Sequence, residues 1–407
     1  MATRRCYPPA VDPRILAIPL ISGLIGWGTN SLAIRMLFAP LHRRGVGLLG
    51  WQGVLPAHAE RMARLCVTMM TTRLINIRAA YSRVNPDQIA SILGPTLEKY
   101  AEEIAEQVLS ERYPRLWEGL PERVRRKVRG RLRERIPEVV KSLMTEIGDD
   151  LERYLDVEEV VVQAFVQDRA LVNELFLNCG RSEFRFIVWS GLFFGGLFGT
   201  IQMVIWFFIQ PGWFLPLTGL IVGWATNWIA LKMVFRPQEP RGKGPFRWQG
   251  LFHRRQAEVS LAYAEFFSTR VLHPEALIGA IIRGPASDRI VQLIQRSVAQ
   301  AVDQASGPAR PLIQLAVGTD EWKALKLAVS ARIVTLIPTE LNRVHDYTEE
   351  ALDLQESLRS RLVGLPPDEF EQVLRPVFQE EEGTLITVGA LLGLCAGVLQ
   401  WAMVTAV

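Results

Sequence analysis

The segment GWGTNSLAIRMLFAP at residues 26–40 returns as GWATNWIALKMVFRP at residues 223–237. Around it, residues 18–75 align with residues 215–272 without a gap. About 18 of about 58 aligned positions are identical, where unrelated segments of average composition would share about three or four. A second pattern returns at nearly the same offset, where Gly191, Gly195, Gly199 and Gln202 correspond to Gly389, Gly393, Gly397 and Gln400. We therefore predict that the chain is a tandem duplication.

Four apolar segments accompany the repeated motifs, and each is long enough to cross a bilayer. They cover residues 15–38, 186–209, 213–235 and 384–407. A helix of about 22 to 24 residues measures about 33 to 36 Å, against a hydrocarbon core of ~30 Å. The alternative is a large water-soluble bundle with these segments as central helices, but such helices are rarely so long or so free of charge. We expect an all-α, polytopic membrane protein with four transmembrane helices.

Each predicted repeat contains two of these spans and one long polar region. The first repeat covers residues 1–210, with its polar region at 42–184, and the second covers residues 211–407, with its polar region at 239–383. Two spans per repeat give both repeats the same orientation, so both polar regions lie on one face of the membrane. The basic residues nearest the spans lie mostly on that face, which predicts a cytoplasmic location in the inner membrane. Arg4, Arg5 and Arg14 at the opposite face favour the reverse orientation.

The composition excludes several classes of site. Hydrophobic residues make up 49% of the chain, charged residues make up 22%, and the net charge is +4. So small a net charge predicts no dedicated nucleic-acid surface. The four cysteines lie far apart, which predicts neither a disulfide framework nor a metal site: Cys6, Cys66, Cys179 and Cys395. We find no catalytic motif among the scattered histidines and carboxylates, so we expect a protein that is not an enzyme and has no cofactor.

Apolar residues recur every three to four positions in both polar regions, which predicts helices there. The first polar region contains an acidic helix at residues 97–111 and a strongly basic helix at residues 123–135. A basic amphipathic helix can lie on anionic lipid or bind a polyanion. It can also pack antiparallel on the acidic helix one hairpin away, and this is the interpretation that we favour.

Polar residues interrupt the first span of each repeat. Helical spacing places Ser22, Gly26, Asn30 and Ala33 on one stripe, and the second repeat has the equivalent stripe. Small residues allow close helix packing, and an asparagine amide in hydrocarbon needs a partner. We expect the two stripes to face each other, with the asparagines bonded together or to backbone. The alternative is a polar transport or binding site at the interface of the repeats, made of Thr29, Asn30, Arg35, Thr226, Asn227 and Lys232.

A basic, glycine-rich loop ending in Trp-Gln-Gly follows each of these spans, at residues 40–53 and 237–250. Tryptophan favours the level of the lipid headgroups, and arginine attracts their phosphates. The candidate headgroup residues are Arg43, Arg44, Trp51, Arg247, Trp248, Arg254 and Arg255. Anchoring by positive charge alone, without specific recognition, explains these residues equally well.

The doubled Thr-Asn-x-x-Ala-x-x-Met-x-Phe-x-Pro motif, the Trp-Gln-Gly loops and the Gly-x3-Gly-x3-Gly-x2-Gln spans resemble the bacterial membrane proteins grouped as domain of unknown function 445. Residues 168–186 and 365–378 share the likeness, which covers nearly the whole chain. The resemblance implies a membrane location and a helical architecture, and it supplies no catalytic residue.

These features together predict a non-enzymatic membrane scaffold or lipid-interacting protein that acts through its helical cytoplasmic regions. The alternative is a transporter or channel with the Thr-Asn residues at its centre. The expected partners are anionic lipid headgroups, with a cytoplasmic protein as a further candidate.

Overall fold

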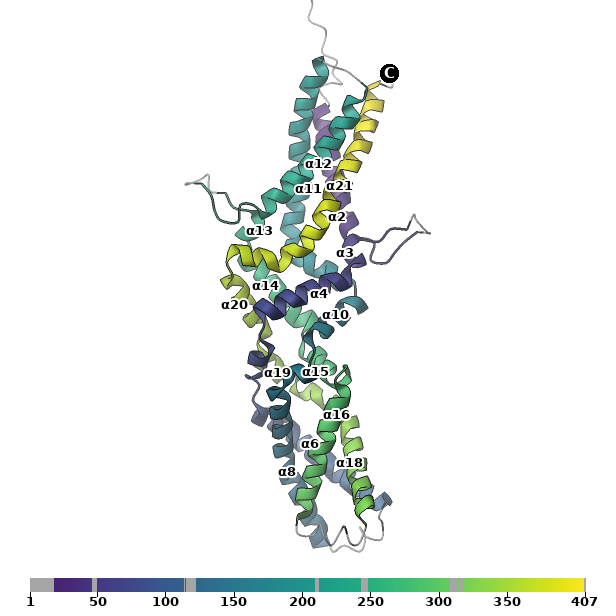
Figure 1. Ribbon diagram of the computed structural model, residues 1–407, viewed down its shortest axis with the longest axis vertical. Helices are drawn as coiled ribbons and strands as arrows, with labels where there is room; N and C mark the ends of the chain where they lie inside the picture. The colour runs from purple at the N-terminus through teal and green to yellow at the C-terminus, as the bar shows by residue number, and fades with distance from the viewer. Residues whose placement is uncertain are drawn as a thin grey trace, which may run out of the picture. The chain divides into compact units, whose positions relative to one another are not determined.

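The computed structural model describes residues 18–45, 50–112, 114, 122–208, 212–242, 248–307, 314 and 318–405. These residues form helices joined by short connections, and isolated backbone bridges pair Arg44 with Trp51 and Arg241 with Trp248 (Figure 1). The all-helical prediction is confirmed for this part of the chain.

The chain forms two compact units, and each unit takes segments from both predicted repeats. The first unit comprises Met1–Leu74, Val162–Ala264 and Leu358–Val407. The second comprises Ile75–Val161 and Glu265–Ser357. The two compact units therefore do not coincide with the two predicted repeats.

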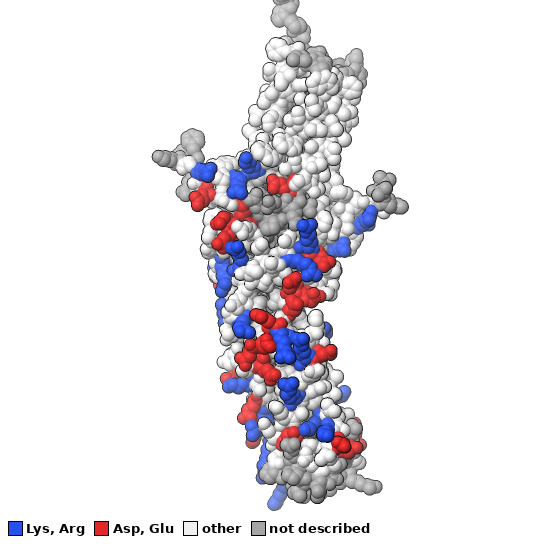
Figure 2. Space-filling view, in the orientation of Figure 1, with Lys and Arg blue, Asp and Glu red and all other residues white. Residues whose placement is uncertain are grey.

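Long apolar helices dominate the first unit. They are α2 (Ile18–Phe38), α11 (Ala170–Phe208), α12 (Phe214–Phe235) and α21 (Pro367–Thr405). α2 packs along α11 and α12 packs along α21, while α11 also contacts α12 and α2 contacts α21. Figure 2 shows almost no charged side chain on the visible face of this bundle away from its α13 end. Large apolar side chains are exposed there instead, such as Phe193, Phe208 and Leu399, as expected of a surface that faces lipid.

Three helices of the described chain are long and apolar enough to cross a membrane: α11, α12 and the part of α21 at Glu382–Ala402. They match the predicted spans that begin at residues 186, 213 and 384. α2 is not among them, and residues 15–17 of the predicted span 15–38 lie outside the described residues. α11 and α21 each run for 39 residues, so both continue well beyond the predicted start of the span.

Shorter helices complete the first unit. They include α3 (Val54–Ala57), α4 (Ala59–Met69), the π-helical turn Met70–Leu74 and α13 (Leu251–Arg254). α10 (Val157–Gln167), α14 (Gln256–Phe266) and α20 (Leu354–Gly364) cross between the two units, and a second π-helical turn follows at Phe267–Val271. Large side chains such as Met62, Phe252, Tyr263 and Phe370 are fully buried.

Amphipathic helices form the second unit. Its long helices are α6 (Pro86–Arg112), α8 (Glu122–Asp149), α16 (Ser287–Ser306) and α18 (Thr319–Glu340). α6 packs on α8 and α18, and α16 packs on α8 and α18 (Figure 1). The short helices α5 (Ile77–Tyr81), α9 (Leu151–Tyr154), α15 (Pro274–Arg283) and α19 (His345–Leu352), with a 3₁₀ turn at Leu341–Val344, complete it.

The basic helix predicted at residues 123–135 lies within α8, and it packs on the acidic helix within α6. Arg133 pairs with Glu98 at 3.3 Å and with Glu102 at 2.7 Å, and Lys141 pairs with Asp87 at 2.8 Å. The order of these partners along the two helices shows that they run antiparallel. The packing interpretation is therefore confirmed for the described side chains.

Candidate functional site

Glycines bring α2 into backbone contact with α11, and α12 into backbone contact with α21. A Cβ atom added to Gly26 would collide with the carbonyl oxygen of Gly191. The second predicted repeat has the same arrangement, because a Cβ atom at Gly223 would collide with the carbonyl oxygen of Gly389. Such close approach brings many atoms into van der Waals contact, which is a main source of helix association in lipid.

The predicted intramembrane asparagines lie at these two glycine interfaces. Asn30 donates its Nδ2 hydrogen to the carbonyl oxygen of Ile187 at 2.8 Å, and Asn227 donates to that of Leu385 at 2.9 Å. Thr29 and Thr226 instead bond within their own helices, to the carbonyl oxygens of Gly26 (3.1 Å) and Gly223 (3.2 Å).

This arrangement differs from the expected one, in which the two stripes face each other. Each stripe faces the second long helix of its own repeat, because the glycines there let that helix approach and offer its backbone carbonyls. The bond to backbone, which was one of the two expected partners of the asparagines, is the one found. Asn30 Oδ1 and Asn227 Oδ1 are buried and accept no hydrogen bond among the described residues.

A polar bridge joins the two predicted repeats inside the bundle. Gln202 on α11 donates from Nε2 to Thr218 Oγ1 on α12 at 2.7 Å. Its Oε1 accepts a hydrogen bond from Ser22 Oγ on α2 at 3.2 Å. Gln400, at the equivalent position of α21, is also buried, but its Nε2 has no partner among the described residues. The sequence pattern marked both glutamines as repeated residues but did not indicate this bridge.

The repeated Trp-Gln-Gly motif closes the loop after α2 and the loop after α12. The backbones of Arg44 and Trp51 exchange two hydrogen bonds of 2.8 and 2.7 Å, and those of Arg241 and Trp248 do the same. Gln52 then donates to the carbonyl oxygen of Leu41 at 2.7 Å. The glycine is required because a Cβ atom at Gly53 would lie 2.8 Å from backbone atoms of residues 38 and 39.

A hollow of about 820 Å³ lies at the C-terminal end of α12, beside the second of these loops. The side chains that give it its chemistry are Trp228, Lys232, Arg236, Glu239, Arg241 and Trp248. Lys232 Nζ lies 4.5 Å from the centre of the Trp228 ring, which itself stacks on Trp224. Three cations and one carboxylate therefore surround a space with two indole rings. Ser31 and Ala39 occupy the equivalent positions of Trp228 and Arg236 in the first repeat.

The other predicted headgroup residues have different environments. Arg255 donates from Nη1 to both carboxylate oxygens of Glu183, at 2.9 and 2.8 Å, and from Nε to Glu258 at 2.8 Å. Its guanidinium is therefore bound by protein carboxylates. Arg254 and Trp51 are exposed, whereas Arg247 lies outside the described residues.

Behind the hollow lies a buried polar cluster that the sequence analysis did not identify. Glu371 on α21 is almost fully buried, and its Oε2 lies 3.1 Å from His253 Nε2. Gln238 donates to the same oxygen at 2.6 Å, and Arg236 lies 3.9 Å from the other oxygen. Arg236 thus reaches both the hollow and the cluster. The described residues contain no group of three or more histidine, cysteine or acidic side chains that could hold a metal ion.

Comparison with known proteins relates part of the chain to cyanobacterial membrane proteins. A UPF0754 membrane protein of Synechococcus sp. is 27% identical over 192 residues, which are 42% of this chain and 45% of the relative. A UPF0754 membrane protein of Synechococcus elongatus is 49% identical over 63 residues, which are 13% of this chain and 15% of the relative. The chain thus spans less than half the length of each of these curated relatives.

No family model and no solved structure matches the chain. Its apolar helices nevertheless agree with what the relatives' names say of them. The chain is therefore a membrane protein with relatives among bacterial proteins named UPF0754 membrane protein.

Proposed function

We propose that this chain is a non-enzymatic, multi-pass protein of the bacterial cytoplasmic membrane that binds anionic phospholipid headgroups. The observation that carries this proposal is the hollow at the end of α12, where Lys232, Arg236 and Arg241 meet two tryptophans. α12 is apolar enough to cross a membrane, so its basic end lies at the level expected of lipid phosphates.

The chemistry of the hollow suits a phosphodiester. Each basic side chain near an anionic leaflet contributes about 1 kcal/mol of attraction. Trp228 and Trp248 have the amphipathic rings that favour the interface between hydrocarbon and headgroups. Arg236 is oriented on one side by Glu371, at 3.9 Å, so the hollow has one cation positioned by the protein.

The proposal includes α2 as a fourth span and a tandem duplication as the origin of the fold. Arg35, near the C-terminal end of α2, can extend its charge to the headgroups, which removes most of the cost of burial. The asparagine bonds, the glycine contacts and the closed Trp-Gln-Gly loops recur in both repeats, and this recurrence supports both ideas. The polar regions would then lie in the cytoplasm, where they form a scaffold that can also bind a protein partner.

A transporter or channel remains the second candidate. The buried, unpartnered Oδ1 atoms of Asn30 and Asn227 favour it, because a polar atom in such a place can bind a passing ligand. The backbone contact between the glycines beside these asparagines favours packing instead.

The headgroup site can be tested by lipid retention. The full chain is extracted in mild detergent from membranes that contain phosphatidylglycerol and phosphatidylethanolamine, and bound lipid is counted by native mass spectrometry. We expect retained phosphatidylglycerol, and Arg241→Gln should weaken its binding about fivefold, the equivalent of ~1 kcal/mol. Arg44→Gln, at the equivalent position of the first repeat, is the matched control. Equal loss in both variants would indicate anchoring by charge alone and would contradict a site at the hollow.

A further inference from the structure

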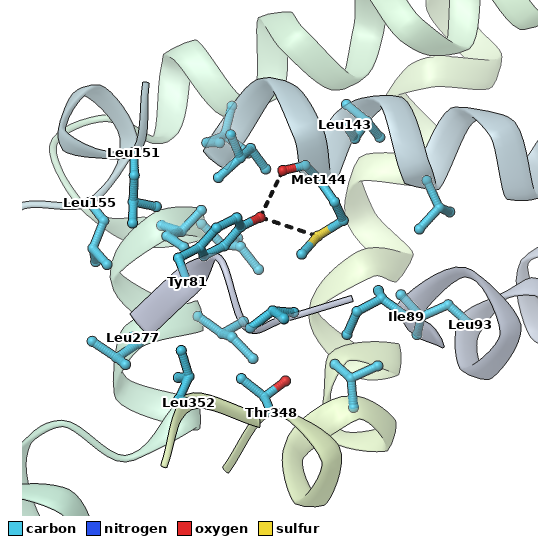
Figure 3. Close-up of a pocket in the computed structure, with 18 of the residues that line it drawn as sticks. Tyr81, Ile89, Leu93, Leu143, Met144, Leu151, Leu155, Leu277, Thr348 and Leu352 are labelled. Atoms are coloured by element: carbon cyan, nitrogen blue, oxygen red, sulfur yellow. Dashed lines mark hydrogen bonds between the residues drawn. The ribbon is translucent and has the colours of Figure 1, made fainter. Parts of the chain in front are cut away.

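The second unit contains a cavity of about 210 Å³ that is partly open to the surface. Its walls come from α5, α6, α8 and α9 of the first repeat and from α15, α16 and α19 of the second. Figure 3 shows leucine and isoleucine side chains, among them Ile89, Leu93, Leu143 and Leu277, arranged around it. None of the helices that carry these four side chains is a candidate membrane span.

Two of the polar side chains at the wall, Tyr81 and Glu340, are bonded within the protein, and the third is Thr348. Tyr81 donates its hydroxyl hydrogen to the carbonyl oxygen of Met144 at 2.9 Å (Figure 3). Glu340 accepts hydrogen bonds from Tyr100, at 3.1 Å, and from Arg343, at 2.7 Å. A buried water needs two to four polar partners, whereas an apolar cavity of about 150 Å³ stays dry and takes up apolar molecules. The wall therefore suits an apolar ligand better than water.

Contacts outside the cavity also join the helices that form its wall. Ion pairs such as Arg133–Glu102 and Lys141–Asp87 join the outer faces of α6 and α8. Glu340 is 7% exposed and holds Tyr100 of α6 against the C-terminal end of α18. These contacts connect the helices outside the cavity, so their inner faces can remain apart.

We propose that this cavity binds the alkyl chain of a fatty acid. A single chain matches a wall made almost entirely of leucine, isoleucine and valine side chains, and the membrane to which the first unit belongs is a source of such molecules. The carboxylate would remain outside the apolar wall, where water can solvate it. This site is separate from the headgroup hollow, which lies in the first unit, so either proposal can fail without the other.

The test uses palmitic acid with a diazirine in mid-chain as a photoreactive probe. The full chain in lipid nanodiscs is irradiated with the probe, and labelled peptides are identified by mass spectrometry. We expect saturable labelling of peptides that contain residues 77–97, 140–155 and 277–294, with competition by unlabelled palmitate. Labelling of the apolar helices α11, α12 and α21 by probe dissolved in the bilayer serves as the internal reference.

Two filling variants and one surface variant make the result decisive. Leu293→Trp and Ile281→Phe occupy the cavity from different helices and should lower labelling of the second unit about tenfold, while the reference labelling stays constant. Leu327→Trp, at a position 58% exposed on α18, should change nothing. Circular dichroism confirms that each variant is folded. Filling an open cavity should also raise the melting temperature, whereas both variants would lower it if the helices were already in contact.

A probe of phosphatidylcholine with a diazirine in one acyl chain forms the second arm. Labelling of the second unit by this phospholipid and not by palmitate would overturn the assignment to a fatty acid. Unsaturable labelling, or equal labelling of wild type and both filling variants, would overturn the cavity as the binding site.

Discussion

Asn30 on α2 is hydrogen-bonded through Nδ2 to the carbonyl oxygen of Ile187 on α11, at 2.8 Å and in a buried position. Gly26 and Gly191 lie in backbone contact one turn away. The glycines make this bond possible, because only a helix without side chains at the contact can bring its carbonyl within reach of so short an amide. The bond in turn fixes the register of the two helices.

Replacing a contact glycine should separate the helices. Gly191→Ala places a Cβ atom against the backbone of Gly26 and the amide of Asn30, so we expect a loss of about 1 to 3 kcal/mol in unfolding free energy. Equilibrium unfolding in detergent measures this loss. Gly28→Ala is the control, because nothing lies within 4 Å of the added atom. An unaffected Gly191→Ala variant would contradict the close approach of α2 and α11.

Removing the asparagine amides should have a small effect on stability. Hydrogen bonds between helices in membranes contribute about 0.6 kcal/mol on average, so Asn30→Leu and Asn227→Leu should each cost less than about 1 kcal/mol. The same variants separate the two candidate functions. A transporter would lose flux in a proteoliposome assay while the protein remained folded, and a lipid-binding protein would keep its retained phosphatidylglycerol.

The buried Glu183 should contribute more to stability through Arg255 than the exposed Glu258 does. Glu183 has a side chain that is 6% exposed, and Glu183→Gln leaves a partly buried guanidinium without its main partner. We expect a loss of about 2 to 3 kcal/mol in unfolding free energy, below the range for fully buried pairs because Arg255 is 26% exposed.

Glu258 provides a matched control for this pair. It binds Nε of the same arginine at 2.8 Å, but its side chain is 69% exposed. Glu258→Gln should therefore cost less than about 1 kcal/mol. Equal losses in the two variants would show that burial of Glu183 does not determine its contribution.

Burial raises the pKa of the Cys66 thiol from 9.0 to about 12. The folded state thus favours the neutral thiol, and this contribution to stability is complete below about pH 9 and declines as the pH rises toward 12. The thiolate is the reactive form, so the folded chain should not react with N-ethylmaleimide at Cys66 between pH 7 and 9. Mass spectrometry of the digested protein measures the modification, and the denatured chain provides the positive control. Rapid reaction of the folded chain would show that Cys66 is accessible.

The sequence predicted the helices and three of the four expected spans, because both follow from local hydrophobic periodicity. It also placed Asn30 and Gly26 of α2 on one stripe. Periodicity does not reveal which helix such a stripe faces. We expected the two stripes to face each other, whereas α2 packs on α11 and α12 packs on α21. The basic helix was easier to place, because its acidic partner lies one hairpin away in the sequence.

Side chains that meet over long sequence separations were harder to predict. Arg255 was a headgroup candidate because it is a basic residue near a predicted span. The sequence does not show whether such a residue faces lipid or a carboxylate, and the partner of Arg255 is Glu183, which is 72 residues away. His253 and Glu371 are 118 residues apart, and neither has a repeated counterpart that would mark it. Glu371 lies beside Phe370 and Val373, and all three are buried on α21. A search of the sequence for charged residues within apolar stripes could have found it.

The division of both units between distant stretches of chain has a consequence for biosynthesis. The second unit needs Glu265–Ser357 to complete the walls that Ile75–Val161 begin. A ribosome adding about 5 to 20 residues per second needs roughly 5 to 20 s to synthesise the intervening chain. During that interval α6 and α8 have each other to pack against but lack α16 and α18, so the leucines and isoleucines that later face those helices stay exposed on the nascent chain.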